Sequence, residues 1–333
     1  MRILVTGGGG FLGRHICAQL IQRGDTVRSI ARSDYPNLRA MGVETVRGDL
    51  TVLEDVQQAA RDCDAVIHTA AKVGMWGPEE AFVQGNILAT QNVLRACKEQ
   101  GVRAMVFTSS PSVTTHPGDT INGPQDLPYP DTYEAFYPKT KARAEALVLE
   151  ANAPELRTTS LRPHLIWGPE DPHMIPRLLD RARSGRLKIV GDGQNVVDLT
   201  YVDNAAAAHL QALDALLGSA QPALAGRAYF ISDDAPVNLW QWLNDLFQQV
   251  GLQPVRGKVS LKTARRLGAI AERAFGALGV QRDPPMTRFV ASQLATSHWF
   301  DMAPAKRDFG YTPVVSPEQG KALLVDWIKR ELL

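Results

Sequence analysis

The chain has 333 residues and a formal net charge of +1, from 36 basic and 35 acidic side chains. This length suffices for a sizeable core in one large or two modest domains, and the balanced charge leaves no global field that would recruit nucleic acid. Its three cysteines, Cys17, Cys63 and Cys97, form no C-x-x-C pair. We therefore expect reduced, mostly buried thiols in a cytoplasmic protein, with neither a leader peptide nor a membrane-spanning stretch.

The first residues predict a strand, a glycine-rich turn and a helix. Residues 3–5 (ILV) are typical of a strand buried on both faces, and residues 6–13 (TGGGGFLG) follow directly. In the G-x-x-G-x-x-G spacing, the first glycine permits a tight bend, the second admits a pyrophosphate, and the third lets helix and strand pack closely. Four consecutive glycines are also compatible with a flexible turn, but their place after a first strand favours a dinucleotide site. The residues assigned to the cofactor here are Gly7, Gly10, Phe11, Leu12 and Gly13.

Strands and helices alternate through the first half of the chain. Further strands are predicted at residues 26–31, 43–47, 65–68, 104–108 and 157–162. The alternation predicts an α/β fold with a doubly wound parallel sheet of the Rossmann type. Past Gly168 the alternation weakens, which indicates a smaller, discontinuous C-terminal substrate domain. We expect a dinucleotide-binding domain at residues 1–166 and 196–222 and a substrate domain at residues 167–195 and 223–333.

The residues after the second predicted strand bear on the choice of cofactor. Arg32 comes first and Asp34 two positions later. An arginine here can accept the extra phosphate of NADP, whereas an acidic side chain would bond the adenosine ribose of NAD. Arg32 could also be a solvated surface residue. We expect NADP, used as NADPH, and consider NAD the less favoured cofactor.

Small side chains follow the fourth predicted strand. Ala70 and Ala71 would leave room for the ribose and pyrophosphate of the cofactor, and the apolar loop at residues 73–78 is expected to form a wall of the substrate site. His68, at the end of the strand, is expected to be packed rather than catalytic. The other histidines show no metal-ligand spacing, so no metal is expected.

A serine, a tyrosine and a lysine follow the fifth predicted strand. Ser110 lies just past the strand, and Tyr137 and Lys141 would share one face of the next helix. A nearby ammonium lowers the pKa of a phenol from ~10, which makes it a usable acid and base near neutrality. Isolated Tyr-x-x-x-Lys pairs are mostly surface pairs, but the combination with the glycine turn and the serine predicts a ketone–alcohol oxidoreductase. Ser109 and Ser112 lie close enough to compete for the role of Ser110.

These motifs together resemble the extended short-chain dehydrogenase/reductases, and within them the 3β-hydroxysteroid dehydrogenase/isomerase family. The matching stretches are residues 6–13, 107–113, 137–141, 161–171 and 201–204. A closer similarity to bacterial ketone reductases of long-chain olefin biosynthesis rests on residues 30–36 (IARSDYP), 70–78 (AAKVGMWGP) and 307–313 (RDFGYTP).

The resemblance implies an activity in lipid metabolism. It implies an NADPH-dependent reduction of a long-chain 2-alkyl-3-keto acid to the 3-hydroxy acid. Tyr137 would then be the general acid, Lys141 its partner and a ligand of the nicotinamide ribose, and Ser110 the residue that binds the carbonyl oxygen.

The resemblance also assigns roles outside the catalytic residues. Asp49, with Leu50 beside it, would contact the adenine, although Asp49 could instead cap the next helix. Pro163 would lie under the nicotinamide, and Asn86 would order the backbone of the active site. Family members often pair through two long helices, here residues 79–100 and 137–152, so a homodimer is one expected arrangement.

Other functions remain open from the sequence. A steroid or sterol 3β-hydroxy dehydrogenase is one, although the steroid-acting relatives often carry a spanning stretch that this sequence lacks. A nucleotide-sugar epimerase or dehydratase is another, disfavoured because the sixth strand ends in Leu-Arg-Pro at residues 161–163 rather than Tyr-Phe-Asn. A cofactor-sensing binding protein would need no Tyr137 and Lys141 pair.

The helix expected at residues 261–280 has an apolar stripe with basic residues elsewhere. It either packs on its own domain or forms a lid or membrane-surface helix for a lipid-like substrate. Peripheral contact with a membrane, or with another enzyme of the pathway, is therefore also an expectation.

Overall fold

A parallel sheet of seven strands forms the larger part of the molecule, in the order β12-β7-β5-β4-β1-β2-β3. The computed structural model describes residues 1–218 and 222–333. The strands are β1 (Arg2–Thr6), β2 (Thr26–Ala31), β3 (Glu44–Arg47), β4 (Ala65–His68), β5 (Ala104–Thr108), β7 (Arg157–Pro163) and β12 (Ala228–Ile231). The strand order reverses between β1 and β4, and ligands of such sheets bind at the carboxyl ends of the strands at this point. The predicted doubly wound fold is confirmed.

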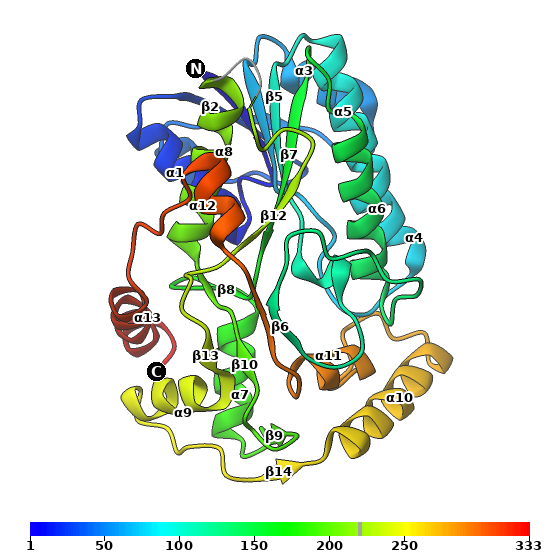
Figure 1. The fold of residues 1–333 in the computed structure, drawn as a ribbon, viewed down its shortest axis with the longest axis vertical. Helices are drawn as coiled ribbons and strands as arrows, with labels where there is room; N and C mark the ends of the chain where they lie inside the picture. Colours follow the sequence, from blue (N-terminus) through cyan, green and yellow to red (C-terminus); the bar gives the residue numbers. More distant parts are fainter. Residues whose placement is uncertain (219–221) are drawn as a thin grey trace.

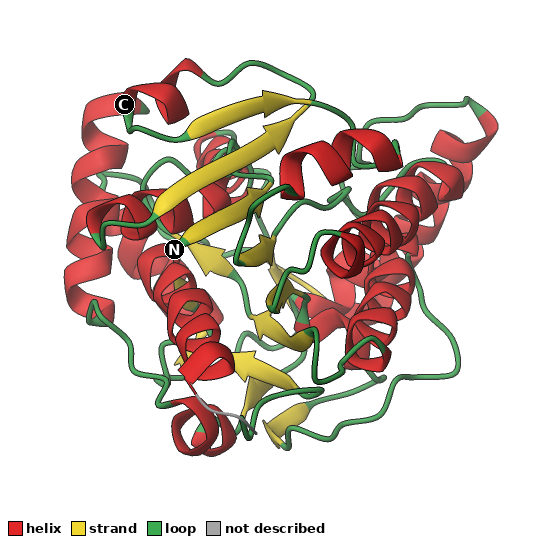
Figure 2. Cartoon of the chain, turned by 90° about the horizontal axis from the view of Figure 1, so that it is seen from above, coloured by secondary structure: helices red, strands yellow, loops and turns green. Residues whose placement is uncertain are grey.

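Helices cover both faces of this sheet (Figures 1 and 2). Alternate residues of β1 enter two separate hydrophobic clusters, because side chains alternate along a strand: Ile3 and Val5 enter one and Leu4 the other. The first cluster includes residues of α1 (Phe11–Gln22) and α8 (Val202–Gly218). The second includes residues of α3 (Leu53–Ala60), α5 (Ala89–Glu99) and α6 (Phe136–Glu150).

Three small sheets lie at the other end of the molecule, seen below the large sheet in Figure 1. They pair as β13-β10-β15-β6, β11-β8 and β14-β9. The strands are β6 (Thr120–Gly123), β8 (Ile166–Trp167), β9 (Ile189–Val190), β10 (Val196–Val197), β11 (Thr200–Tyr201), β13 (Val237–Asn238), β14 (Lys258–Val259) and β15 (His298–Phe300). The helices of this part are α7 (Met174–Arg183), α9 (Leu239–Gln249), α10 (Leu261–Ala277), α11 (Arg288–Gln293) and α13 (Pro317–Glu331), whereas α12 (Ala303–Phe309) lies beside β12 and α8.

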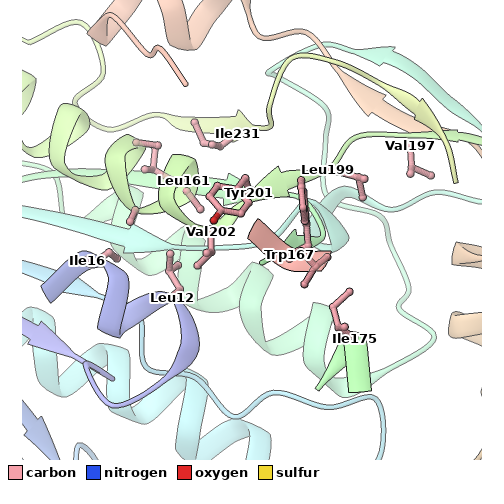
Figure 3. Close-up of a cluster of buried hydrophobic side chains, with 14 of the residues drawn as sticks. Leu12, Ile16, Leu161, Trp167, Ile175, Val197, Leu199, Tyr201, Val202 and Ile231 are labelled. Atoms are coloured by element: carbon pink, nitrogen blue, oxygen red, sulfur yellow. The ribbon is translucent and has the colours of Figure 1, made fainter. Parts of the chain in front are cut away.

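A shared hydrophobic core joins the two parts (Figure 3). It includes Leu12 and Ile16 from the first helix and Ile175 from α7. The rings of Trp167 and Tyr201 lie between these groups, with their centroids 5.1 Å apart. The continuous core holds the strand ends of the large sheet next to the smaller sheets.

Several elements differ from the sequence expectations. The strand β12 lies within the range expected for the substrate domain, yet it pairs with β7 in the large sheet. The single helix expected at residues 79–100 is α4 (Glu79–Phe82), a π-helical segment at Val83–Leu88, and α5. Residues 196–201 form two short strands in different sheets, β10 and β11, because the chain changes partner between them.

Candidate active site

The glycine turn is tightly built around the start of α1. Gly7 has a φ of +73°, which favours glycine, and a Cβ on Gly13 would lie 2.1 Å from the Gly7 carbonyl oxygen. The Gly10 N–H donates to that same oxygen at 2.9 Å. Because no side chain caps α1 at Gly10, the N–H groups at Phe11 and Leu12 are available to an anion. This turn fits the pyrophosphate of a dinucleotide.

The segment after β4 packs directly against this turn. A Cβ on Gly7 would lie 2.9 Å from the Ala70 backbone, and the Ala70 N–H donates to the Thr6 hydroxyl at 3.3 Å. Ala71 follows it and is partly buried. His68 is buried between the hydroxyls of Thr6, at 2.6 Å, and Thr90, at 3.0 Å. Burial lowers the pKa of His68 to about 3, so it is a neutral, packed residue.

Asn86 links the Ala70–Lys72 segment to the helix of the candidate tyrosine. It lies in the π-helical turn, and its side-chain oxygen accepts from the Lys72 N–H at 2.7 Å. Its side-chain nitrogen donates to the Thr140 hydroxyl on α6 at 2.9 Å. The backbone beside the cofactor turn is therefore fixed relative to α6.

A cavity of about 690 Å³ lies at the ends of β2 and β3. Arg32 and Asp34 line it, as expected from the sequence, and Arg39 and Arg47 line it as well. The Arg39 guanidinium pairs with Asp34 and holds the pKa of that carboxyl below its usual range. The sequence analysis missed Arg39 and Arg47, although arginines at residues 32, 39 and 47 near two strand ends were a usable signal.

Asp49 and Leu50 lie beside this region at the end of β3. Asp49 accepts hydrogen bonds from the Thr51 N–H and hydroxyl, both at 2.9 Å, and these bonds lower its pKa. The carbonyl oxygen of Leu50 accepts from the Asn92 side chain at 2.9 Å. Asp49 orders the turn before α3 but is not its N-cap residue, which is Val52. The contact of Asp49 with adenine stays a prediction.

Ser110 and Tyr137 line one cavity of about 270 Å³. Ser110 opens a 3₁₀ turn after β5, and its hydroxyl oxygen lies 2.9 Å from that of Ser112. Tyr137 sits in the first turn of α6. The Ser109 hydroxyl is buried without a partner and does not line the cavity. The structure thus favours Ser110, with Ser112 at its side, as the serine of the site.

Burial controls the ionisation of the tyrosine and the lysine. Burial raises the pKa of Tyr137, and a hydrogen bond with Ser110 opposes that rise. Burial lowers the pKa of Lys141 to about 7. The Lys141 amine donates to the Thr108 carbonyl oxygen at 2.5 Å and lies 3.9 Å from the centroid of the Phe107 ring.

The expected effect of Lys141 on Tyr137 is therefore not seen. The spacing of four residues places both side chains on the same side of α6, but it does not set where the long lysine chain ends. That chain ends on the β5 backbone at Thr108, and the transfer of the phenol out of water decides the direction of its pKa shift.

A buried ion pair supports α6 behind the site. Arg162 on β7 and Glu145 on α6 are joined at 2.6 Å, with side chains 5% and 0% exposed. The Tyr129 hydroxyl donates to Glu145 at 2.7 Å, and Arg162 also donates to the Gln125 carbonyl oxygen at 3.3 Å. The pair ties α6, β7 and the loop before α6 together.

The rest of the cavity wall is mainly apolar and comes from distant parts of the chain. Pro163, at the end of β7, lines it, as does Met75 from the loop expected to form a wall. Further apolar lining residues are Leu165, Phe289, Val290, Leu294 and Phe300. Local sequence does not indicate the α11 and β15 residues of the site, because β15 pairs with β6 from a distant part of the chain.

Three further properties bear on the chemistry of the chain. Within residues 1–218 and 222–333, no group of three or more His, Cys, Asp and Glu side chains could hold a metal ion. In the same described part, no helix is both long and apolar enough to cross a membrane. Cys17, Cys63 and Cys97 are free and buried.

A doubly wound sheet with a glycine turn, next to a cavity lined by a serine and a tyrosine, with a lysine four residues after the tyrosine on the same helix, defines a short-chain dehydrogenase/reductase. The sequence profile of the 3-beta hydroxysteroid dehydrogenase/isomerase family matches residues 4–262. The chain belongs to this family and is an oxidoreductase, as the motifs predicted.

Proteins of known name are similar over nearly the whole chain. A 2-alkyl-3-oxoalkanoate reductase of Stenotrophomonas maltophilia is 50% identical over 323 residues, covering 96% of this chain and 97% of that protein. One of Shewanella oneidensis is 46% identical over 324 residues, covering 95% and 83%. A mouse (Mus musculus) sterol-4-alpha-carboxylate 3-dehydrogenase, decarboxylating, is 33% identical over 321 residues, covering 95% and 87%.

A solved structure shares the fold over its full length. MoeE5 in complex with UDP-glucose and NAD superposes with a TM-score of 0.74 at 25% identity, covering 100% of both chains. The nucleotide-sugar enzymes and this chain thus share one architecture, and the residues of the site must decide between their chemistries.

Proposed function

We propose that this protein is an NADPH-dependent reductase that converts a long-chain 2-alkyl-3-keto acid to the 3-hydroxy acid. The cavity that Ser110 and Tyr137 share with apolar residues of α11 and β15 carries the proposal. A ketone between alkyl chains needs hydroxyl groups at one wall and apolar side chains around the rest. The relatives at 50% and 46% identity, both named 2-alkyl-3-oxoalkanoate reductase, support the substrate class.

The residues of the chain fit a nicotinamide dinucleotide. Gly7, Gly10 and Gly13 would hold its pyrophosphate, Lys141 its nicotinamide ribose, and Pro163 would lie under the nicotinamide ring. When bound, the reduced cofactor supplies the hydride that the keto carbon receives. The complex of MoeE5 with NAD supports a cofactor of this class.

The phenol and the serine act on the oxygen of the ketone. The Tyr137 hydroxyl donates its proton to this oxygen as negative charge develops there. The Ser110 hydroxyl donates a hydrogen bond to the same oxygen, which stabilises that charge. The raised pKa of Tyr137 keeps the phenol protonated at neutral pH, which is the form that reduction requires.

The preference for NADPH rests on the charge of the cavity at the ends of β2 and β3, where the adenosine of the cofactor would bind. We call it the adenosine cavity. Arg32, Arg39 and Arg47 line it against one carboxylate, Asp34, which Arg39 already pairs. The excess of positive charge suits the extra phosphate of NADPH, because guanidinium groups bind phosphates bidentately. NAD remains the alternative cofactor.

A sterol 3-dehydrogenase is the second candidate, favoured by the relative at 33% identity. Both names describe a carboxyl group on the carbon next to the reacting carbon. In a 2-alkyl-3-oxoalkanoate this carbon is C2, and in a sterol-4-carboxylate it is C4. The two candidates therefore share one arrangement of reacting groups and differ in the hydrocarbon that carries them.

One helix face supports delivery of the substrate from a lipid surface. On the outward side of α10, Leu267 and Ile270 are 55% and 63% exposed, and Leu278 at the end of the helix is 76% exposed. The exposed Arg266 and Arg273 flank them, so the face suits the anionic surface of a membrane. We propose that this face lies on such a surface while the protein works in the cytoplasm, as part of olefin biosynthesis.

The side of α10 toward the molecule connects this face to the cavity. A Cβ on Gly268 would lie 2.7 Å from the Thr287 backbone at the start of α11. The Trp76 side chain donates to the Val280 carbonyl oxygen at 2.8 Å, next to the cavity residue Met75. This inner side agrees with the first alternative for residues 261–280, a helix that packs on its own domain.

An assay with three substrate classes tests the proposed function. Purified protein is mixed with NADPH and a long-chain 2-alkyl-3-keto acid, and the nicotinamide absorbance is followed. We expect the absorbance of NADPH to fall with this acid and to stay unchanged with a UDP-sugar. Turnover of a sterol-4-carboxylate with NAD, but none of the alkyl acids, would move the assignment to the second candidate.

A further inference from the structure

Two buried histidines form part of the cavity wall and have no role in the proton transfer to the ketone. His164 follows Pro163 at the end of β7, and His298 opens β15. Both line the cavity of Ser110 and Tyr137. Their Nε2 and Nδ1 atoms, respectively, lie 2.6 Å apart, and the residues are only 6% and 7% exposed.

The hydrogen bonds of the pair determine which nitrogen carries a free lone pair. His298 Nε2 lies 2.9 Å from the Gln293 carbonyl oxygen, which can only accept, so this nitrogen carries hydrogen. In the neutral ring His298 Nδ1 then accepts, and His164 Nε2 donates to it. His164 Nδ1 is left as an acceptor, and no side-chain bond of His164 is seen among the described residues except that to His298.

Both rings of the pair are neutral at neutral pH. Burial lowers the pKa of both rings, and a charge on His298 further lowers that of His164. Asp119, which accepts from the Ser297 N–H, acts in the opposite direction on His298. The other titratable groups near the pair are His116 and Tyr137 of the cavity wall, and Asp198, which accepts from the Phe300 N–H beside His298.

We propose that the His164–His298 pair binds the carboxyl group of the keto acid by sharing one proton with it. This proposal rests on the proposed function and names the subsite for one of its groups. On binding, the substrate carboxylate and one proton enter together. The proton resides on His164 Nδ1, which donates a hydrogen bond to the carboxylate. No bond of the substrate breaks. The positive charge of the histidine pair balances the negative charge of the carboxylate, so the site gains no net charge.

The size of the cavity supports this arrangement. One carbon separates the carbonyl and carboxyl carbons of such an acid, and a cavity of about 270 Å³ carries both the hydroxyls of Ser110 and Tyr137 and the histidine pair on its wall. The remaining wall is mainly apolar and suits the alkyl chains. A buried carboxylate needs a charged or hydrogen-bonding partner, and the histidine pair beside Pro163 can supply one.

The test compares an acid with its methyl ester across pH. The reaction is run in the oxidative direction, with NADP and a long-chain 2-alkyl-3-hydroxy acid or its methyl ester. We expect wild-type kcat/KM to favour the acid at pH 6 by about tenfold or more, which corresponds to one charge-assisted hydrogen bond. Because binding of the acid takes up one proton, kcat/KM for the acid relative to that for the ester should fall by up to about tenfold for each unit that the pH rises.

Two variants and a matched control separate recognition from a structural role. His164→Asn and His298→Asn should remove the preference for the acid and its pH dependence, while kcat/KM for the ester stays within about threefold of wild type. His173→Asn changes an exposed histidine that does not line the cavity and should keep both properties. If one of these two variants fails to fold, the other alone tests whether the pair recognises the carboxyl group.

Three outcomes overturn the proposal. Equal kcat/KM for acid and ester in the wild type would show that the carboxyl group is not recognised, while leaving the reductase assignment intact. Equal losses for acid and ester in both variants would assign the pair a structural role that joins β7 to β15. Absence of turnover with either compound in the wild type would instead overturn the proposed function, and the subsite with it.

Discussion

Lys141 shows how burial changes the chemistry of a single residue. Its amine contacts the Thr108 carbonyl and the Phe107 ring, and its pKa is lowered to about 7. A lysine in water titrates at ~10.4. The folded chain thus releases this proton at a lower pH than the unfolded chain does, and Lys141 is partly neutral at the pH where the enzyme is proposed to work.

This shift predicts a pH dependence of stability. Between pH ~7 and ~10.4 the unfolded state binds more protons at Lys141 than the folded state does, so the free energy of unfolding rises with pH. The variant Lys141→Met lacks this contribution. As the pH rises through this range, the free energy of unfolding of the wild type, measured in urea, should increase relative to that of the variant by a few kcal/mol. Parallel pH profiles for the two proteins would refute the lowered pKa.

Arg32 provides a test of cofactor choice at the residue scale. A hydrogen bond to a charged phosphate contributes ~1.5–3 kcal/mol, so Arg32→Ala should lower kcat/KM for NADPH by roughly tenfold or more. The value for NADH should change little, because NADH lacks the extra phosphate. Arg61→Ala, at an exposed arginine that does not line the adenosine cavity, serves as the control. An equal loss with both cofactors would contradict the NADPH assignment.

At the scale of elements, α6 holds the site because it is fixed on two sides. Its Glu145 pairs with the buried Arg162 on β7, whereas its Lys139 pairs with Glu79 near the surface, with side chains 55% and 45% exposed. The two ion pairs on one helix differ mainly in their access to water. The cost of breaking each should differ accordingly.

The ion pairs give a matched prediction. Glu145→Gln leaves Arg162 buried without a charged partner and should lower the free energy of unfolding by roughly 3–5 kcal/mol. Glu79→Gln breaks the exposed pair and should cost less than ~1 kcal/mol. Urea unfolding of both variants measures the difference. Similar small losses would mean that the buried pair does not anchor α6.

The outward face of α10 gives a prediction about a lipid surface. Wild-type protein should sediment with vesicles that contain an anionic lipid such as phosphatidylglycerol, and less with phosphatidylcholine alone, because basic residues flank the apolar face. The double variant Leu267→Gln, Ile270→Gln should reduce this binding several-fold. Leu323→Gln on α13, where the leucine is 49% exposed, should not.

Two other results of that experiment would contradict the lipid assignment. Binding that is unchanged in the double variant would place any membrane contact elsewhere on the molecule. Self-association of the wild type without vesicles, lost in the double variant, would identify a second copy of the chain as the partner of α10. A homodimer through α5 and α6 stays a separate prediction, since it uses other helices.

Considered as a whole molecule, the large sheet follows from the sequence and the smaller sheets do not. The strands predicted at residues 26–31, 65–68 and 104–108 have those bounds in the structure, and each is largely buried. Residues 117–130 are rich in Gly, Pro, Asp and Asn, which is typical of a loop, yet they contain β6, which pairs with the distant strand β15. Local composition cannot indicate such a partner.

In the candidate site too, some features could be predicted from local sequence and others depend on contacts between distant segments. Local spacing was enough to predict the glycine turn and the shared cavity position of Ser110 and Tyr137. It did not predict that Lys141 would end on Thr108, nor that His164 would meet His298, because these contacts depend on how distant segments pack. The sequence thus indicates a class of chemistry, and the packing of the two parts determines which substrate groups the cavity can receive.

The central claim is that the phenol of Tyr137 gives a proton to the ketone, and the turnover of Tyr137→Phe tests it most directly. The matched control is Tyr133→Phe, which removes a hydroxyl that donates to the Val113 carbonyl oxygen at 3.0 Å and lies outside the cavity lining. With NADPH and the long-chain 2-alkyl-3-keto acid, we expect kcat of Tyr137→Phe to fall by roughly 10²–10⁴, with NADPH binding retained, and kcat of Tyr133→Phe to stay close to wild type. A Tyr137→Phe enzyme with near wild-type turnover would contradict the account.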